Sequence, residues 1–350
     1  MDPDSSLPLA RPSGGSRTRR WPLHGFLRGF LRIMRLVVLL LLLAWATLAI
    51  HFSNLPWPAL RTPLAVAFAI FGVWALWFAR RRGARLLLAA LFGAVALWWS
   101  TIEPSHDRKW RAEMAVLPRA EIHGDRVRIS GVRNFDFRSV EDFTPRYETR
   151  ELSLERLAGV DFYISYWMPG PVGHTFLSFR FEDAPPLSIS IEARQEEGEG
   201  YDPLGSLFKQ FELIYVVGNE RDIVRLRTNF RREDVYLYRI RTSKENARRL
   251  FMVYMERINQ LADRPEFYHL LSNSCTVNIV RYANVVGRQG GFDFRHLLNG
   301  LIDGYLYNAD LLPDFLPLDE LRRRSHINQA AVAAGDVPEF PQLIRASLPY

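Results

Sequence analysis

Cys275 is the single cysteine of this 350-residue chain, and its surroundings are typical of a helix N-terminus, Leu271-Ser-Asn-Ser-Cys-Thr-Val-Asn-Ile-Val280. At such a position the helix dipole and unpaired backbone N–H groups lower the pKa of a thiol and favour the nucleophilic thiolate. A lone cysteine has no intramolecular disulfide partner, so the thiol stays free. The alternative is a buried cysteine that packs as a small hydrophobic residue. The segment therefore predicts that Cys275 is either a nucleophile or a core residue, and the choice depends on whether a base lies near it.

A nucleophilic thiol needs a base, and His174 is the strongest candidate among the eight histidines. It follows the turn Pro169-Gly-Pro171 and begins a strand-like run in which His174, Phe176 and Ser178 share one face. A carboxylate inside an apolar strand is unfavourable unless it is paired, which makes Glu192 in the next predicted strand the candidate that orients the imidazole. The alternative for any one histidine is a solvated or core position.

A second polar cluster lies between residues 215 and 229, and its candidate substrate-binding residues are Tyr215, Arg221, Arg225 and Arg227. On a strand, Arg225 and Arg227 would share a face, and with Arg221 they would suit a phosphate or a carboxylate. The alternative is a set of surface ion pairs with Glu220 and Asp222. The sequence leaves both open.

Asn273, just before the thiol, is a further candidate: it would donate to an oxyanion or cap the helix, and capping is the commoner role. The sequence contains no HExxH, no CxxC and no carboxylate cluster, so no metal is predicted. It also has no GxSxG elbow and no P-loop, and no cofactor is expected.

The first hundred residues have the composition of a membrane anchor. Three apolar stretches, each near the lower length limit for a transmembrane helix, run over Leu36–Phe52, Leu64–Ala79 and Leu86–Ile102. Arginines precede the first stretch and lie between the second and third, whereas the connection between the first and second holds only Arg61. The positive-inside rule therefore predicts a cytoplasmic N-terminus and places everything after Ile102 on the far side of the membrane.

These patterns divide the chain into a basic cytoplasmic segment at residues 1–35, three spans within 36–102 and a periplasmic domain at 103–350. Residues 1–102 hold twelve arginines and two aspartates, so the rest of the chain carries −3 of the total charge of +7. The basic character thus belongs to membrane topology, and nucleic-acid binding is not expected. In a Gram-negative bacterium the protein would lie in the inner membrane.

The last 248 residues are enough for one domain with its own core. Strands rich in Ile, Val, Phe and Tyr are predicted first, including a hairpin turn at His123-Gly-Asp125 and strands at 160–166, 174–181, 187–193, 214–217 and 235–240. A long helix capped by Ser243 follows, and Cys275 begins the next one. Strands followed by helices indicate an α+β domain. The last fifty residues are predicted to be rich in loops.

Seven segments in this order resemble the Lnb N-terminal periplasmic domain family between about Trp110 and Asn284. They are Val116-Leu-Pro-Arg-Ala-Glu-Ile-His-Gly-Asp125, Val132-Arg-Asn-Phe-Asp-Phe-Arg138, Thr144-Pro-Arg-Tyr147, His174-Thr-Phe-Leu-Ser-Phe179, Ser190-Ile-Glu-Ala-Arg194, Phe208-Lys-Gln-Phe-Glu-Leu-Ile-Tyr215 and Asn273-Ser-Cys-Thr276. The resemblance implies a circularly permuted papain-like (NlpC-type) fold, in which the histidine strand precedes the cysteine helix, as His174 precedes Cys275. It does not cover the three N-terminal spans.

Members called Lnb are lipoprotein N-acyltransferases, so the resemblance implies transfer of a fatty acyl chain through a cysteine thioester to the amino group of a diacylated lipoprotein. Membrane phospholipid and a lipoprotein are then the expected substrates. The same His-before-Cys order is similar to that of lecithin–retinol acyltransferase-like enzymes. Two alternatives stay open: an NlpC-type cysteine peptidase or amidase acting on cell-wall peptides, and a non-catalytic periplasmic binding protein. An apolar groove near Cys275 would favour acyl transfer, and a polar cleft with free arginines would favour the peptidase.

Overall fold

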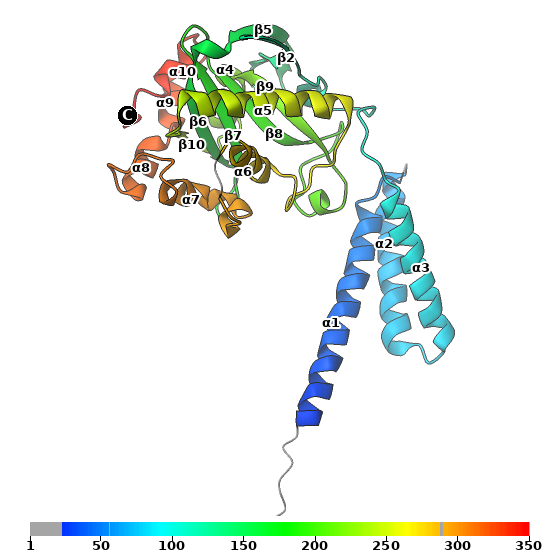
Figure 1. Cartoon of the computed structure of the whole chain (residues 1–350). Coiled ribbons are helices and arrows are strands. Elements are labelled where there is room, and N and C mark those ends of the chain that lie inside the picture. The colour runs from blue at the N-terminus through cyan, green and yellow to red at the C-terminus, as the bar shows by residue number, and fades with distance from the viewer. Residues whose placement is uncertain (1–22, 56, 288–289, 350) are drawn as a thin grey trace, which may run out of the picture.

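The computed structural model describes residues 23–55, 57–287 and 290–349, which form a helical N-terminal part and a larger α+β domain (Figure 1). The N-terminal helices are α1 (Leu23–His51), α2 (Pro58–Val73), which continues as the π-helical turn η1 (Trp74–Phe78), and α3 (Arg82–Ser100). Each is long and apolar enough to cross a membrane, over Phe26–His51, Pro58–Phe78 and Arg82–Ser100. The three predicted spans are confirmed in number.

The first span begins at Phe26 instead of Leu36, because α1 continues through the predicted basic segment. Arg28, Arg32 and Arg35 lie on this helix; arginine is a good helix former, and its long side chain reaches the membrane interface while its stem stays in apolar surroundings. The remainder of the predicted basic segment, residues 1–22, lies outside the described residues.

An eight-stranded sheet forms the centre of the domain, in the order β1-β2-β9-β8-β7-β6-β10, with β5 paired to β2. All pairings are antiparallel except that of β2 with β9. The strands are β1 (Arg119–His123), β2 (Arg126–Arg133), β5 (Tyr147–Ser153), β6 (Leu157–Tyr166), β7 (His174–Phe181), β8 (Leu187–Arg194), β9 (Glu212–Asn219) and β10 (Asp234–Arg239), with β3 (Asp136–Phe137) and β4 (Phe143–Thr144) in a separate small sheet. The predicted strands are all present. Gly124 turns the first hairpin with φ = +60°, which glycine adopts without strain.

Two helices cover one face of the sheet: α5 (Lys244–Asp263) and α6 (Cys275–Val285). The Ser243 side chain accepts a hydrogen bond from the backbone N of Asn246 at 3.1 Å, which confirms the predicted cap of α5. The apolar stripe of α5 packs on the sheet through Phe251 and Tyr254, whose rings lie 5.0 and 5.6 Å from that of Phe179. Since α5 is buried along this stripe, it provides a fixed support for α6 and its N-terminal cysteine.

The opposite face carries α4 (Glu220–Arg225), which continues as the π-helical turn η5 (Leu226–Phe230). The prediction that Arg225 and Arg227 share a strand face is therefore wrong. The alternation of this short run resembles a strand, but Asp222 holds it as a helix against β2 by accepting from the Arg133 side chain at 2.7 Å. Local pattern alone does not separate a short buried helix from a strand.

About half of the last fifty residues form short helices, and turns and loops connect them, so the prediction of a loop-rich end is correct in part. These helices are α7 (Ile302–Asn308), α8 (Leu318–Ser325), α9 (Asn328–Ala334) and α10 (Phe340–Leu343). The C-terminal segment is attached to the sheet by Arg345, which donates to Asp161 at 2.8 Å and to Glu220 at 2.6 Å. Both carboxylates are buried, so these ion pairs hold the C-terminal segment against the second face of the sheet.

The segment after β8 contacts the ends of the spans. Lys209 Nζ donates to the backbone oxygens of Trp99 and Ile102 at 3.1 and 2.9 Å, near the C-terminal end of α3. Phe208 stacks on Phe52 just after α1, with ring centroids 5.8 Å apart. A charged cap and an apolar contact thus fix one side of the domain against the spans.

Candidate active site

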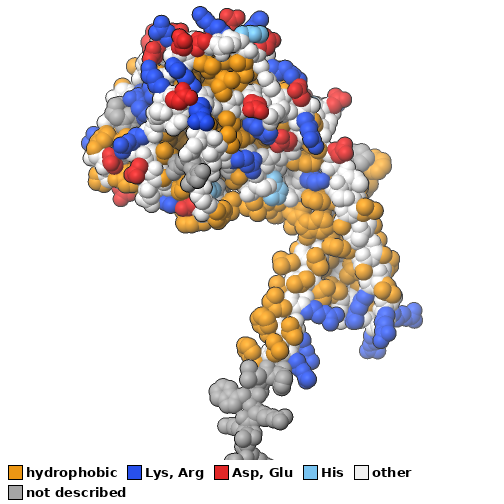
Figure 2. Space-filling model, in the orientation of Figure 1, with side chains coloured by type: hydrophobic (Ala, Val, Ile, Leu, Met, Phe, Trp, Pro, Cys, Tyr) orange, Lys and Arg blue, Asp and Glu red, His pale blue; other side chains and the backbone are white. Residues whose placement is uncertain are grey.

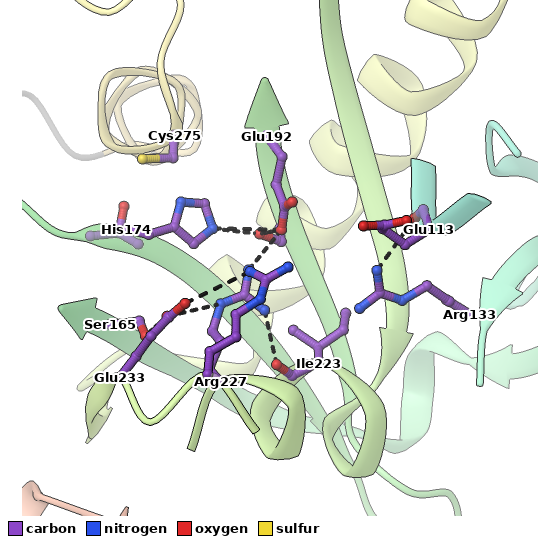
Figure 3. Close-up of polar contacts among 12 residues, drawn as sticks. Glu113, Arg133, Ser165, His174, Glu192, Ile223, Arg227, Glu233 and Cys275 are labelled. Atoms are coloured by element: carbon purple, nitrogen blue, oxygen red, sulfur yellow. Dashed lines mark hydrogen bonds and ion pairs between the residues drawn. The ribbon is translucent and has the colours of Figure 1, made fainter. Parts of the chain in front are cut away.

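Cys275 and His174 face each other at the end of the sheet (Figure 3). His174 is the first residue of β7, and Cys275 is the first residue of α6, with Ser274 as its N-cap. Both residues line a cavity of about 250 Å³, which Glu192 on β8 also borders. The structure therefore brings together the three residues predicted to form a catalytic site, and Figure 3 shows the imidazole between the thiol and the carboxylate.

A serine connects the histidine to the carboxylate. Ser190 Oγ lies 2.6 Å from Nε2 of His174 and donates to Oε1 of Glu192 at 2.7 Å, whereas Nε2 and Oε1 are 3.8 Å apart. Because the hydroxyl proton is directed at the carboxylate, Ser190 accepts from Nε2–H. The second ring nitrogen of His174, Nδ1, is then the one available to the thiol.

The thiol of Cys275 is buried and polarised by its neighbours. Burial alone would raise the pKa of Cys275, but the neighbouring His174, through its charge and polarity, and the polar groups of Thr175 lower it to about 6. A thiolate is therefore the main form at neutral pH.

Asn299 is a third group beside the sulfur. Its Nδ2 lies 3.6 Å from Sγ of Cys275 and donates to Oγ1 of Thr276 at 3.0 Å, and its Oδ1 accepts from the backbone N of Gly173 at 2.8 Å. The amide is thus held with its N–H groups toward the reacting sulfur. A donor in this place can stabilise negative charge on the sulfur or on an oxygen next to it.

Glu192 stays ionised because cations surround it. Burial alone would raise its pKa, but the charges of Arg227, His174 and Arg133, together with the Ser190 hydroxyl, hold the pKa of Glu192 far below its usual range. The closest cation is Arg227, whose Nη2 donates to Oε1 at 2.7 Å. Arg227 is also fixed by the backbone oxygen of Ile223 at 2.8 Å (Figure 3).

The cavity wall is mixed. Its apolar and aromatic residues are Trp167, Val172, Ile191, Ala193, Tyr201, Tyr268, Leu270 and Leu297, and an equal number of its residues are polar or charged. Its two arginines both have acidic partners: Arg227 contacts Glu192 at 2.7 Å, and Arg231 contacts Glu233 at 3.7 Å. The charges of these two arginines are therefore compensated by neighbouring glutamates.

The other predicted substrate-binding residues do not line this cavity. Arg221 and Arg225 both contact Asp336 at 3.2 Å, on the side of α4 that faces the C-terminal segment. The Tyr215 hydroxyl is buried against that of Tyr282 at 2.5 Å. The Asn273 side chain donates to the backbone oxygen of Phe267 at 2.8 Å and thereby holds the loop before α6.

Sequence reasoning missed Ser190 and Asn299. Ser190 had a local signal, since residues 190 and 192 share a face of one strand and the carboxylate was already a candidate. Asn299 had none: it reaches the thiol from a short turn, η7 (Asn299–Leu301), that follows α6. Among the described residues, no group of three or more His, Cys, Asp or Glu is placed to hold a metal.

Comparison with known families gives one match, which includes the cysteine, the histidine, the carboxylate and Asn299. Residues 143–303 match the model of the Lnb N-terminal periplasmic domain. The resemblance predicted from the sequence motifs is thereby confirmed for this Lnb segment, which contains five of the seven motifs and extends further past α6 than they do. The motifs at Val116–Asp125 and Val132–Arg138 precede the matched residues. No curated protein and no solved structure matched the chain. The Lnb segment and the three apolar helices indicate a membrane protein with a periplasmic domain.

Proposed function

We propose that this protein is a membrane-anchored, cysteine-dependent acyltransferase that moves a fatty acyl chain from phospholipid to the amino group of a lipoprotein. The observation that carries the proposal is the pairing of a low-pKa thiol with His174, which is linked through Ser190 to Glu192, at a cavity that is bordered in part by apolar side chains. A thiolate, a base and an ionised orienting group are the requirements of two-step acyl transfer.

In the first step the Cys275 thiolate attacks the carbonyl carbon of a phospholipid acyl ester. The C–S bond forms, the ester C–O bond breaks, and the leaving glycerol oxygen takes a proton from Nδ1 of His174. The products are a lysophospholipid and an acyl thioester on Cys275. The Asn299 amide, 3.6 Å from the sulfur, is placed to donate to the oxyanion of the tetrahedral intermediate.

In the second step the amino group of the acceptor attacks the thioester carbonyl. The C–N bond forms, the C–S bond breaks, and His174 takes the proton that the amine loses. The thiolate and the imidazolium are restored, while Ser190 and Glu192 hold the ring in the same orientation throughout.

The cavity favours an acyl chain over a cell-wall peptide. A site for a peptide carboxylate would present an arginine without an acidic partner, but Arg227 and Arg231 in this cavity each face a glutamate. A second, largely apolar groove of about 470 Å³ lies between α5, α6 and α7 and extends to Thr276, next to the nucleophile. This groove suits an aliphatic chain.

The proposal includes a cytoplasmic N-terminus, a periplasmic domain and an inner-membrane location in a Gram-negative bacterium. It rests on the arginines of α1 and of the connection between α2 and α3. The permuted papain-like fold is part of the same proposal, supported by the chain order in which β7 with His174 precedes α6 with Cys275.

The test of the acceptor is a transfer assay with the full-length protein in phospholipid nanodiscs. The acceptor is a diacylated lipopeptide with a free N-terminal amine, and the controls are its N-acetylated form and a cell-wall peptide. We expect a triacylated lipopeptide and an equal amount of lysophospholipid. Cleavage of the cell-wall peptide without acyl transfer would replace this proposal by the peptidase.

A further inference from the structure

Large apolar side chains are exposed in three segments that border the catalytic cavity. These segments also contribute Trp167, Leu270 and Leu297 to the cavity wall. We define the apolar rim as Trp167, Met168, Leu271, Val285, Phe292 and Leu301, of which Phe292 is 79% exposed and Val285 64%. Large exposed apolar patches are rare on soluble proteins and usually mark a site that binds another protein, a ligand or a membrane.

Residues of the apolar rim line two hollows that adjoin the cavity. Leu271, Val285 and Phe292 line a shallow depression together with Leu297, which also lines the cavity. On the other side, Met168 and Leu301 line a second depression together with Trp167, which again borders the cavity. The cavity and the two depressions are therefore adjacent, with Leu297 and Trp167 as common lining residues.

The spans hold this side of the domain near the membrane. Phe208 and Lys209, which contact the ends of α1 and α3, follow Tyr201 of the cavity wall closely along the chain. The Tyr201 ring lies 6.3 Å from that of Trp167 in the rim. In Figure 1, α6 and α7 lie on the side of the domain from which the spans extend, and Figure 2 shows hydrophobic side chains along this underside.

We propose that the apolar rim rests on the bilayer surface and opens the cavity directly to membrane lipid. The continuity of the rim with the membrane-facing side of the molecule argues for lipid as its occupant. A tryptophan at this level suits the interface between headgroups and acyl chains. The claim that lipid enters as a substrate rests on the proposed function, whereas the membrane contact itself does not.

The contact is tested by site-directed spin labelling of the full-length protein in nanodiscs of phosphatidylethanolamine and phosphatidylglycerol. Cys275→Ser removes the only native thiol, and Met168→Cys, Leu271→Cys or Phe292→Cys then carries the label. The control is Glu151→Cys on β5, at the far side of the domain from the spans (Figure 1). The readout is the ratio of nitroxide collisions with oxygen, which dissolves in lipid, to collisions with a water-soluble nickel chelate.

We expect a ratio at least several-fold higher at the three rim positions than at residue 151. Equal ratios would overturn the proposal, and so would protection from both reagents, because that would indicate a protein–protein contact. This outcome is independent of whether Cys275 reacts with lipid, so a failure of the rim and a failure of the proposed function are distinguishable.

The route for lipid is tested with Phe292→Asp combined with Leu301→Asp, and the matched control is Val332→Asp, an exposed apolar residue on α9. We expect acylation of Cys275 by bilayer phospholipid to fall at least tenfold in the rim variant only. Acylation by a short, water-soluble ester and alkylation by iodoacetamide should be unchanged, which shows that the site is intact. Equal loss with the soluble ester would contradict a role in lipid access.

Discussion

Ser190 Oγ lies 2.6 Å from Nε2 of His174, so a hydroxyl occupies the place at which a carboxylate would contact the imidazole directly. The carboxylate of Glu192 follows at 2.7 Å from the same Oγ. Because Arg227 keeps Glu192 ionised, the hydroxyl proton is directed toward the carboxylate and Ser190 can only accept from the ring. This fixes the tautomer in which Nδ1 faces Cys275.

Replacing Ser190 with alanine should slow acylation of Cys275. Without the hydroxyl, Oε1 of Glu192 stays 3.8 Å from Nε2 and no longer fixes the tautomer. We expect a loss of roughly ten- to a hundredfold, below the ~10²–10⁴-fold contribution of the general base itself, with the pH dependence of thiol alkylation shifted upward. Ser190→Thr keeps the hydroxyl and should retain most of the rate. An unchanged rate in Ser190→Ala would show that the carboxylate acts without the serine.

The alkylation rate of Cys275 should depend on pH in the acidic range. The rate follows the thiolate fraction, so with a pKa of about 6 it should be half-maximal near pH 6 and constant above about pH 7. In His174→Ala the hydrogen bond and the charge that lower the pKa are lost, and the midpoint should move upward, toward that of an ordinary thiol near 8.5. Stopped-flow alkylation with iodoacetamide measures both profiles. The same midpoint in the two proteins would contradict the pairing of Cys275 with His174.

Asn299→Ala should slow acyl transfer without removing the thiolate. Loss of one oxyanion donor lowers the rate by about 10²–10³-fold in acyl-transfer enzymes. Since the pKa of Cys275 is lowered by His174 and Thr175, the alkylation midpoint should stay near pH 6. Acylation kinetics and alkylation profiles of the same variant separate the two effects. A normal acylation rate would assign Asn299 to holding Gly173 and the loop before β7.

Arg227→Met should destabilise the domain as well as the site. It leaves Glu192 buried without its closest cation, and breaking a buried ion pair from one side costs roughly 3–5 kcal/mol. The double variant with Glu192→Gln should recover part of the thermal stability but not the activity. Arg221→Ala serves as the control, because this arginine lies outside the cavity and is partly exposed. Equal thermal unfolding of Arg227→Met and Arg221→Ala would contradict this account.

The sequence was sufficient to predict the long helix and all strands of the main sheet except β5, because hydrophobic alternation and the Ser243 cap are local signals. It also selected Cys275, His174 and Glu192 as candidates, since a helix N-terminus, a Gly/Pro turn and an unpaired carboxylate each indicate chemistry, and the structure places all three at one cavity. Their mutual contact depends on strand register: β7 and β8 pair Phe176 with Ser190, so His174, two residues before Phe176, is near Ser190 and Glu192.

The features that could not be predicted from the sequence depend on contacts between residues that are distant along the chain. Asn299 contacts Cys275 although the two residues are 24 positions apart in the sequence, and no periodic pattern predicts this contact. The run from Arg221 to Arg227 alternates like a strand, but the burial of Asp222 against Arg133 selects a helix. The C-terminal helices are short, so their local pattern is weak, and Arg345 attaches them to carboxylates that are distant in the sequence, Asp161 on β6 and Glu220 on α4.

Acyl capture on the thiol tests the central claim most directly. Full-length protein is incubated with membrane phospholipid in detergent, and intact mass spectrometry is used to detect a hydroxylamine-labile acyl adduct. The account predicts the adduct in the unmodified protein, its absence in Cys275→Ala, and a rate of formation ~10²–10⁴-fold lower in His174→Ala. No adduct, together with failure of iodoacetamide to alkylate Cys275 at neutral pH, would contradict the account and leave a binding role for the domain.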